Sequence, residues 1–179
     1  GSDASDNSVN YTLPTLVDGL SISASYSSGG AAIDSTTAFA ATYTGVEGLS
    51  VSYGAGEAGS TTATASGDVT TMKASYAIGS FTAAVSNTES DKDSTGIDEE
   101  MDSWKLSYTV SDNLSISYGE ETHETSGQTV DEEFEAISVS YTTGGMTLTA
   151  ANYEASGIAN ATGEAGEANR WKLAASFAF

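Results

Sequence analysis

The last ten residues of the chain constrain its fold more than any other segment. From Arg170 to Phe179, apolar or aromatic side chains alternate with small or charged ones, which predicts a strand with two different faces. This strand runs to a terminal aromatic carboxylate, although a chain end usually frays unless another element holds it. We therefore expect a paired strand whose apolar face meets a non-aqueous surrounding. That face carries Trp171, Leu173, Ala175, Phe177 and Phe179.

A two-faced unit of the same kind recurs along the chain. Residues 19–26, 48–53 and 113–118 each alternate apolar residues with Ser, and residues 145–149 follow the pattern loosely with Thr. Each unit follows a short turn that contains Gly, Asp or Asn. The pattern predicts about eleven strands, near 8–13, 20–27, 36–43, 49–54, 69–78, 81–87, 101–110, 114–119, 134–142, 146–153 and 170–179.

The predicted connections alternate between short turns and long polar segments. This alternation is typical of an antiparallel, up-and-down transmembrane β-barrel, whose strands join through short turns on one side and longer loops on the other. No stretch approaches the roughly 20 apolar residues that a spanning helix needs. The long loops are predicted at 28–35, 55–68, 88–100, 120–133 and 154–169.

Charge is distributed unevenly along this pattern. The chain has 25 Asp and Glu against 5 Lys and Arg, and a formal net charge of −20. On the short-turn side the acids are Asp18, Glu47 and Asp112, and the others fall in the long loops, the strand tips beside them or the N-terminal segment. The acidity argues against nucleic acid as a partner, because phosphate binding needs a basic surface.

Aromatic residues mark the predicted strand ends. Tyr residues at opposite edges of the strands resemble the two aromatic girdles of a membrane barrel. Two aromatics break the alternation, because Tyr153 and Phe134 share parity with the small polar residues of their strands; a bulge, or a side chain beyond the membrane edge, would explain either. The aromatics predicted at a membrane interface are Tyr43, Tyr76, Tyr108, Tyr141, Phe177 and Phe179.

The terminal strand resembles the C-terminal signature of Gram-negative outer-membrane proteins, and the hairpin repeats resemble a general porin, similar to those of marine alphaproteobacteria. This resemblance implies passive diffusion of small hydrophilic solutes and ions through a water-filled barrel in the bacterial outer membrane. It also implies a homotrimer, contact with the lipid bilayer and lipopolysaccharide, and recognition of the last strand by the barrel-assembly machinery. It implies neither catalysis nor a cofactor.

The odd number of predicted strands indicates whether they form a whole barrel or part of one. Single-chain bacterial barrels have an even strand number. Eleven strands are therefore expected to be the C-terminal part of a longer barrel, and the resemblance implies sixteen strands in all. Residues 1–7 are then the tail of an outer loop, and residues 8–179 supply barrel strands with short periplasmic turns and long acidic outer loops.

The scarce basic residues form the first candidate site. Four of the five Lys and Arg have the parity of the small polar residues, which predicts the inner face of a barrel. The functional interpretation is that these residues form a pore-lining basic strip. The structural interpretation is that they balance the charge of nearby acids, or that a Lys among them snorkels. The strip consists of Lys73, Lys105, Arg170 and Lys172.

An acidic segment at 91–102 forms a second candidate site. Its oxygen side chains at the first, third and fifth positions and its Gly at the sixth match the first half of an EF-hand calcium loop. The twelfth residue is Asp rather than Glu and the flanks are strands, so a solvated acidic loop is the default and Ca²⁺ the alternative. The candidate ligands are Asp91, Asp93, Thr95, Asp98 and Asp102.

Catalysis has little support in the sequence. The chain's one His, His123, lies in an acidic segment with no Ser or Cys motif that would complete a triad. A different class of protein remains open, namely an acidic extracellular β-rich structural protein such as an adhesin, a surface-layer segment or a filament subunit, with or without bound calcium. That class shares the Ser, Thr, Gly and Asp content but does not predict aromatics at both strand edges or acids sorted to one side.

Overall fold

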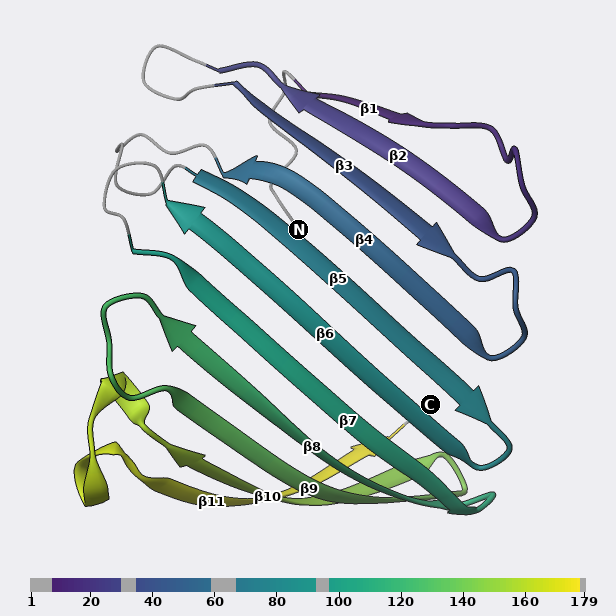
Figure 1. Cartoon of the computed structure of the whole chain (residues 1–179). Coiled ribbons are helices and arrows are strands. Elements are labelled where there is room, and N and C mark those ends of the chain that lie inside the picture. Colours follow the sequence, from purple (N-terminus) through teal and green to yellow (C-terminus); the bar gives the residue numbers. More distant parts are fainter. Residues whose placement is uncertain (1–7, 30–34, 59–66, 93–96, 178–179) are drawn as a thin grey trace. The chain divides into compact units, whose positions relative to one another are not determined.

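The computed structural model describes residues 8–29, 35–58, 67–92 and 97–177. These residues form eleven strands that neighbour one another in chain order, with antiparallel pairing, as the sequence predicts (Figure 1). The strands are β1 (Ser8–Thr12), β2 (Leu20–Ser27), β3 (Thr36–Tyr43), β4 (Leu49–Ala58), β5 (Gly67–Ile78), β6 (Phe81–Lys92), β7 (Glu99–Ser111), β8 (Leu114–Thr125), β9 (Glu132–Thr143), β10 (Met146–Ser156) and β11 (Ala168–Phe177).

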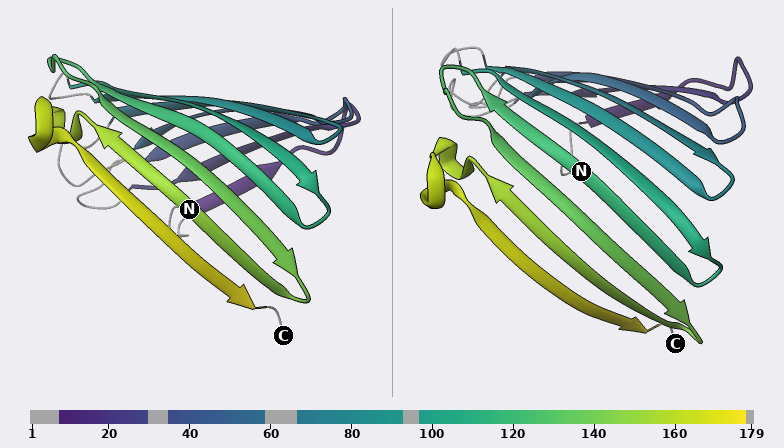
Figure 2. Two further views of the ribbon diagram at one scale, coloured as in Figure 1. Left: turned by 90° about the horizontal axis from the view of Figure 1, so that it is seen from below. Right: turned by 60° about the horizontal axis from the view of Figure 1, so that its bottom comes forward.

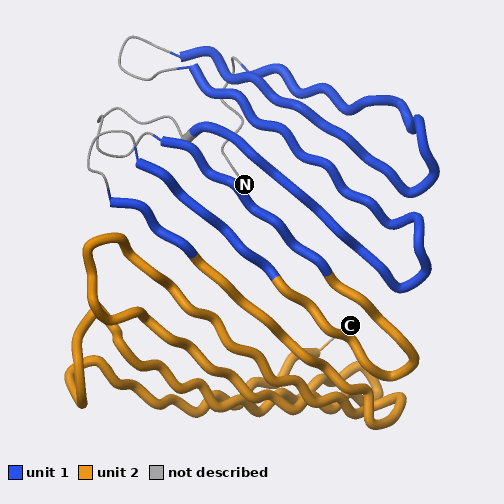
Figure 3. The backbone as a smooth tube through the Cα atoms, viewed as in Figure 1, with its two compact units in different colours: residues 1–74, 86–100 blue, residues 75–85, 101–179 orange. Residues whose placement is uncertain are grey.

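The chain divides into two compact units (Figure 3). Unit 1 comprises residues 1–74 and 86–100, and unit 2 comprises residues 75–85 and 101–179. Strands β1 to β4 lie in unit 1 and β8 to β11 in unit 2, while β5, β6 and β7 contribute residues to both.

In unit 1, two short turns approach each other closely. The backbone N–H of Thr44, after β3, donates a hydrogen bond of 2.7 Å to the carbonyl of Gly19, which precedes β2. Gly19 has a φ of 79°, and a Cβ there would lie 2.3 Å from the backbone nitrogen of Gly45. Only Gly combines this left-handed backbone with so close an approach.

In unit 2, β8 to β11 pair without an inserted residue. The Cα partners run continuously from Leu114–Tyr141 to His123–Glu132, and from Met146–Phe177 to Ala155–Ala168. Two short 3₁₀ segments, η1 (Ile158–Asn160) and η2 (Gly163–Gly166), follow β10 at the strand ends opposite the β9–β10 turn (Figure 2).

Several strands are longer than the sequence predicts. β4 reaches Ala58, β6 reaches Lys92 and β8 reaches Thr125, so the loop bounds predicted at 55–68, 88–100 and 120–133 are wrong. The residues added to β6 and β8 are polar, and those added to β4 are Ala, Gly and Glu, so none continues the alternation with large apolar residues that the prediction used. Backbone hydrogen bonds continue a ladder without that signal.

Apolar side chains are exposed in both units. Ala151, at 2 % exposure, is the one buried apolar side chain among the described residues, whereas Leu173 is 82 % and Trp171 74 % exposed. In the part of the chain that the structure describes, no helix has the length and apolar character to cross a membrane.

Candidate functional site

Each unit has two chemically different faces. In unit 2 the first face carries most of the Ser and Thr residues of β8 to β10 and is called the hydroxyl face. The second face carries Ile137, Val139 and Leu148 and is called the apolar face. The register of β1 to β4 separates unit 1 in the same way, with Ser23 and Ser25 on one side and Ile22 and Tyr26 on the other.

Hydroxyl groups pair across the strands on the hydroxyl face of unit 2. The Oγ atoms of Ser117 and Ser138 are 2.8 Å apart, and those of Ser140 and Thr149 are separated by 3.3 Å. Ser138 and Ser140 are half-buried, whereas Ile137 and Val139, which alternate with them on β9, are exposed. Polar side chains are thus the better covered ones, the reverse of a sheet packed for water.

The predicted interface aromatics lie toward the short-turn ends of their strands. In unit 2, Tyr141 faces Leu114 and Leu148 on the apolar face, and Phe177 faces Met146. The Tyr108 ring lies 4.6 Å from the Phe81 ring, and Tyr76 is exposed near the end of β5. In unit 1, Tyr43 ends β3 on the apolar face, and Phe179 lies outside the described residues.

Three of the predicted basic residues share the hydroxyl face of unit 2. Arg170 pairs with Tyr153, and Lys172 with the buried Ala151. Lys105 lies on the same side of its strand as Gly119, because a Cβ built on that Gly would come within 3.3 Å of the Lys105 Cβ. Lys73 belongs to unit 1 and shares parity on β5 with Thr71, whose hydroxyl bonds Thr88.

These four cations differ from the fifth in their pairing. The ammonium of Lys92 lies 2.7 Å from a carboxylate oxygen of Glu99. No acid of the described residues comes within 4.0 Å of the charged groups of the other four, which are Lys73, Lys105, Arg170 and Lys172. The pore-lining role of these four residues stays a prediction.

The register aligns five residues in one row across unit 2. Gly119 pairs with Ala136, Ala136 with Tyr153, and Tyr153 with Arg170. The guanidinium carbon of Arg170 lies 5.4 Å from the centre of the Tyr153 ring, within the range of a cation–π contact. Lys105 completes the row beside Gly119.

The pairing also explains the two aromatics that break the alternation. β9 and β10 carry no bulge over their paired residues, so Tyr153 and Phe134 lie on the hydroxyl face. Of the two explanations offered by the sequence, the bulge is wrong.

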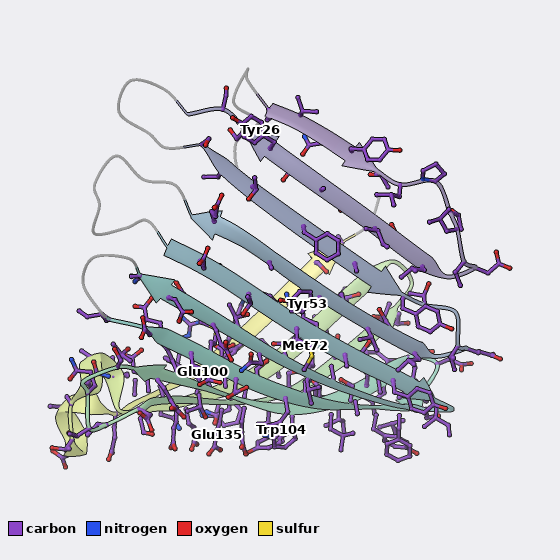
Figure 4. The ribbon with its side chains drawn as sticks, turned by 45° about the horizontal axis from the view of Figure 1, so that its top comes forward. Tyr26, Tyr53, Met72, Glu100, Trp104 and Glu135 are labelled. Carbon is purple, nitrogen blue, oxygen red and sulfur yellow. The ribbon has the colours of Figure 1, made fainter. Side chains whose placement is uncertain are left out.

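Carboxylates lie on the opposite face, toward the long-loop ends of the strands. Glu120 pairs with Glu135, and Glu135 with Glu154. The Tyr118 hydroxyl donates to Glu120 at 2.5 Å and to Glu135 at 3.1 Å, and the indole N–H of Trp104 donates to Glu120 at 3.1 Å. Figure 4 shows Trp104 and Glu135 on the same side of the ribbon. This carboxylate row could not be predicted from apolar alternation, because Glu120 and Glu154 lie in the polar ends of β8 and β10, which were predicted as loops.

The acidic segment at 91–102 is only partly described. Asp91 lies in β6 and Asp102 in β7, while Asp93 and Thr95 are outside the described residues. Within the described ranges, no three Asp, Glu, His or Cys side chains are grouped to hold a metal ion. His123, predicted in a loop, lies in β8, and its Nδ1 is 3.5 Å from a carboxylate oxygen of Glu132.

Comparison with known proteins identifies the family to which this chain belongs. The sequence pattern that defines the Gram-negative porins matches residues 1–179. The chain belongs to the Gram-negative porin family. Porins of this family lie in the bacterial outer membrane. A search of curated proteins finds no match.

Solved structures share the fold at low sequence identity. The anion-selective porin from Comamonas acidovorans is 16 % identical with a TM-score of 0.70, and the match covers 84 % of this chain and 48 % of that one. OmpT of Vibrio cholerae in a trimer form is 20 % identical with a TM-score of 0.63, over 93 % and 59 % of the two chains. A variant of that protein lacking loop L8 is 21 % identical with a TM-score of 0.62, over 95 % and 62 %. The chain thus spans about half to three fifths of the length of these proteins.

Proposed function

We propose that the protein is a channel, not an enzyme, through which small hydrophilic solutes and ions diffuse passively across the outer membrane. The hydroxyl face lines a water-filled β-barrel, and the apolar face contacts lipid. One observation carries this proposal: Ile137 and Val139 are exposed while Ser138 and Ser140, between and beside them, are half-buried and bonded to other hydroxyls. A sheet with water inside and hydrocarbon outside requires that distribution.

We propose that the complete channel contains more strands than this chain supplies. The chain spans about half the length of the Comamonas porin. Eleven strands are an odd number, and we propose that they are the C-terminal part of a sixteen-stranded barrel. Solute choice then depends on size and on charges along the wall, with the basic strip as the contribution of this part.

The proposed partners follow from the same assignment. We propose a homotrimer, supported by the trimer form described for the Vibrio OmpT. Lipid and lipopolysaccharide contact the apolar face, and the barrel-assembly machinery binds the C-terminal strand. Calcium binding by residues 91–102 stays a separate prediction, which calcium titration of the native protein and of its Asp98→Asn variant tests.

Planar-bilayer conductance of the detergent-extracted native protein tests the channel. We expect stepwise openings in groups of three, and an intact mass well above 18.2 kDa from the same sample. An absence of conductance, a mass that matches the 179 residues and solubility without detergent would instead support the acidic extracellular protein.

A further inference from the structure

An open cavity of about 730 Å³ lies over the middle of the row described above. Its floor is Gly119 and Ala136, which leave space because neither has a side chain larger than a methyl group. A Cβ at Gly119 would lie 2.7 Å from the Trp104 carbonyl oxygen, so β7 and β8 approach too closely there for a larger residue. The volume falls within the roughly 300–1,000 Å³ typical of sites for small ligands.

A basic side chain lies at each end of this cavity. Lys105 lines it from β7 and Arg170 from β11, and neither forms an ion pair with an acid of the described residues. The Tyr153 ring holds the Arg170 guanidinium at 5.4 Å, which orders the charge without neutralising it. An anion in the cavity thus meets a positive group that no carboxylate has already satisfied.

Aromatic surface borders the same cavity. Phe134 and Tyr153 both line it, and they are 37 % and 38 % exposed. Over the described residues of β7 to β11, these two are the aromatics that lie on the hydroxyl face. Phe134 exposes apolar surface on the hydroxyl face, and an apolar ligand that buries this surface binds with a favourable free energy.

The charge of the cavity limits the ligand further. Glu121 also lines it, because it pairs with Phe134 and shares parity with Gly119. With Lys105 and Arg170, this gives the hydroxyl-face side of the cavity one net positive charge. The other three carboxylates that line the cavity, Glu120, Glu135 and Glu154, alternate with these positions and belong to the other face.

We propose that this cavity is a binding subsite for small organic monoanions that carry an apolar ring or chain. The carboxylate of the ligand meets Arg170 or Lys105, and its apolar part lies over Ala136 against Phe134 and Tyr153. The Ser117 and Ser138 hydroxyls border the cavity and remain available to water and to the carboxylate. The inference rests on the proposed function only in that the hydroxyl face must line the path of solutes.

Two measurements on the detergent-extracted native protein test the subsite. Single-channel recording in KCl with added benzoate measures block of the current, and equilibrium dialysis with labelled benzoate measures binding without any channel. We expect saturable binding and concentration-dependent block by benzoate. Acetate, which has the charge but no ring, and benzyl alcohol, which has the ring but no charge, should each act at least about tenfold more weakly.

Variants of residues that line the cavity test whether benzoate binds there. Arg170→Gln and Phe134→Ser should each weaken benzoate binding and block by about tenfold or more, while the KCl openings remain. Lys172→Gln is the matched control, since it removes the same charge from the same strand and face but does not line the cavity. We expect it to change benzoate binding by less than about twofold.

Several outcomes would overturn the inference. Equal action of acetate and benzoate would leave only a general field for anions. Unchanged benzoate binding in Arg170→Gln and Phe134→Ser, or an equal loss in Lys172→Gln, would also refute the subsite. A wild-type protein that conducts but binds no benzoate refutes the subsite alone. A protein that binds benzoate as predicted but never conducts refutes the channel alone.

Discussion

Removing the two cations at the ends of the row tests whether the hydroxyl face acts on ions electrostatically. The variant carries Lys105→Gln and Arg170→Gln. Neither side chain forms an ion pair with a described acid, so no buried carboxylate is left without its partner. The change removes two positive charges and keeps side chains of similar size and polarity.

The size of the effect follows from the register. The two residues lie on β7 and β11, four strand spacings of about 4.8 Å apart, which is about 19 Å. An ion above Ala136, in the middle of the row, is then roughly 10 Å from each charge. Each interaction is worth about 0.4 kcal/mol in a dielectric of water before screening. Screening leaves roughly 0.6 kcal/mol for both charges at ~0.01 M salt and roughly 0.3 kcal/mol at ~0.1 M.

Reversal potentials under a KCl gradient measure this change. The two charges attract an anion and repel a cation by the same amount, so both effects add in the permeability ratio. We expect the anion-to-cation permeability ratio of the double variant to fall roughly sevenfold at ~0.01 M salt and roughly threefold at ~0.1 M. At ~1 M the difference should vanish, because the Debye length is then only about 3 Å. Lys92→Gln is the control, since the Lys92 charge already lies 2.7 Å from Glu99.

The expected electrostatic action of the hydroxyl face fails if the permeability ratio of the double variant equals that of the wild type at ~0.01 M salt. It also fails if the change persists at ~1 M, because a screened charge cannot act there. A shift in Lys92→Gln as large as that of the double variant would mean that total charge, and not position on the hydroxyl face, sets the ratio.

Three further predictions concern assembly and stability. Leu173→Lys places a charge on the apolar face and should cost about 2–4 kcal/mol near the middle of the bilayer, whereas Ala174→Lys, on the hydroxyl face, should assemble normally; heat-modifiable gel mobility reports folding. Gly19→Ala should lower the unfolding temperature more than Gly127→Ala, because both have positive φ but only Gly19 has backbone within 4 Å of the added Cβ. Ser138→Ala should cost about 0.5–1.5 kcal/mol in the free energy of unfolding, by leaving a half-buried hydroxyl on β8 without its partner.

Each of these predictions has its own contrary result. Equal folding of the two Lys variants would mean that the faces are not exposed to different solvents. An equal loss in the two Gly variants would show that backbone strain, and not the approach of the turns, decides the effect. An Ala variant at position 138 as stable as the wild type would mean that water replaces the missing hydroxyl contact.

Local periodicity gave most of the fold. The alternation of Ser138 and Val139 predicts which side chain takes which face, and the short Gly- and Asn-containing turns predict where the chain reverses. The parity of Lys105, Arg170 and Lys172 likewise predicts the face they occupy. Strand ends such as Ala58 and Thr125 were missed, because polar strand tips keep their ladder hydrogen bonds after the apolar pattern has ended.

The position of residues across strands was decided only by the tertiary structure. Parity is local, since it depends on a period of two along one strand. Whether Lys105 lies level with Arg170, however, depends on four successive pairings, and a shift in any one of them would move the two cations apart. The sequence by itself therefore determined two faces and the charges on them. The register alone placed Gly119 and Ala136 between those charges and Phe134 and Tyr153 beside them, and so formed the cavity.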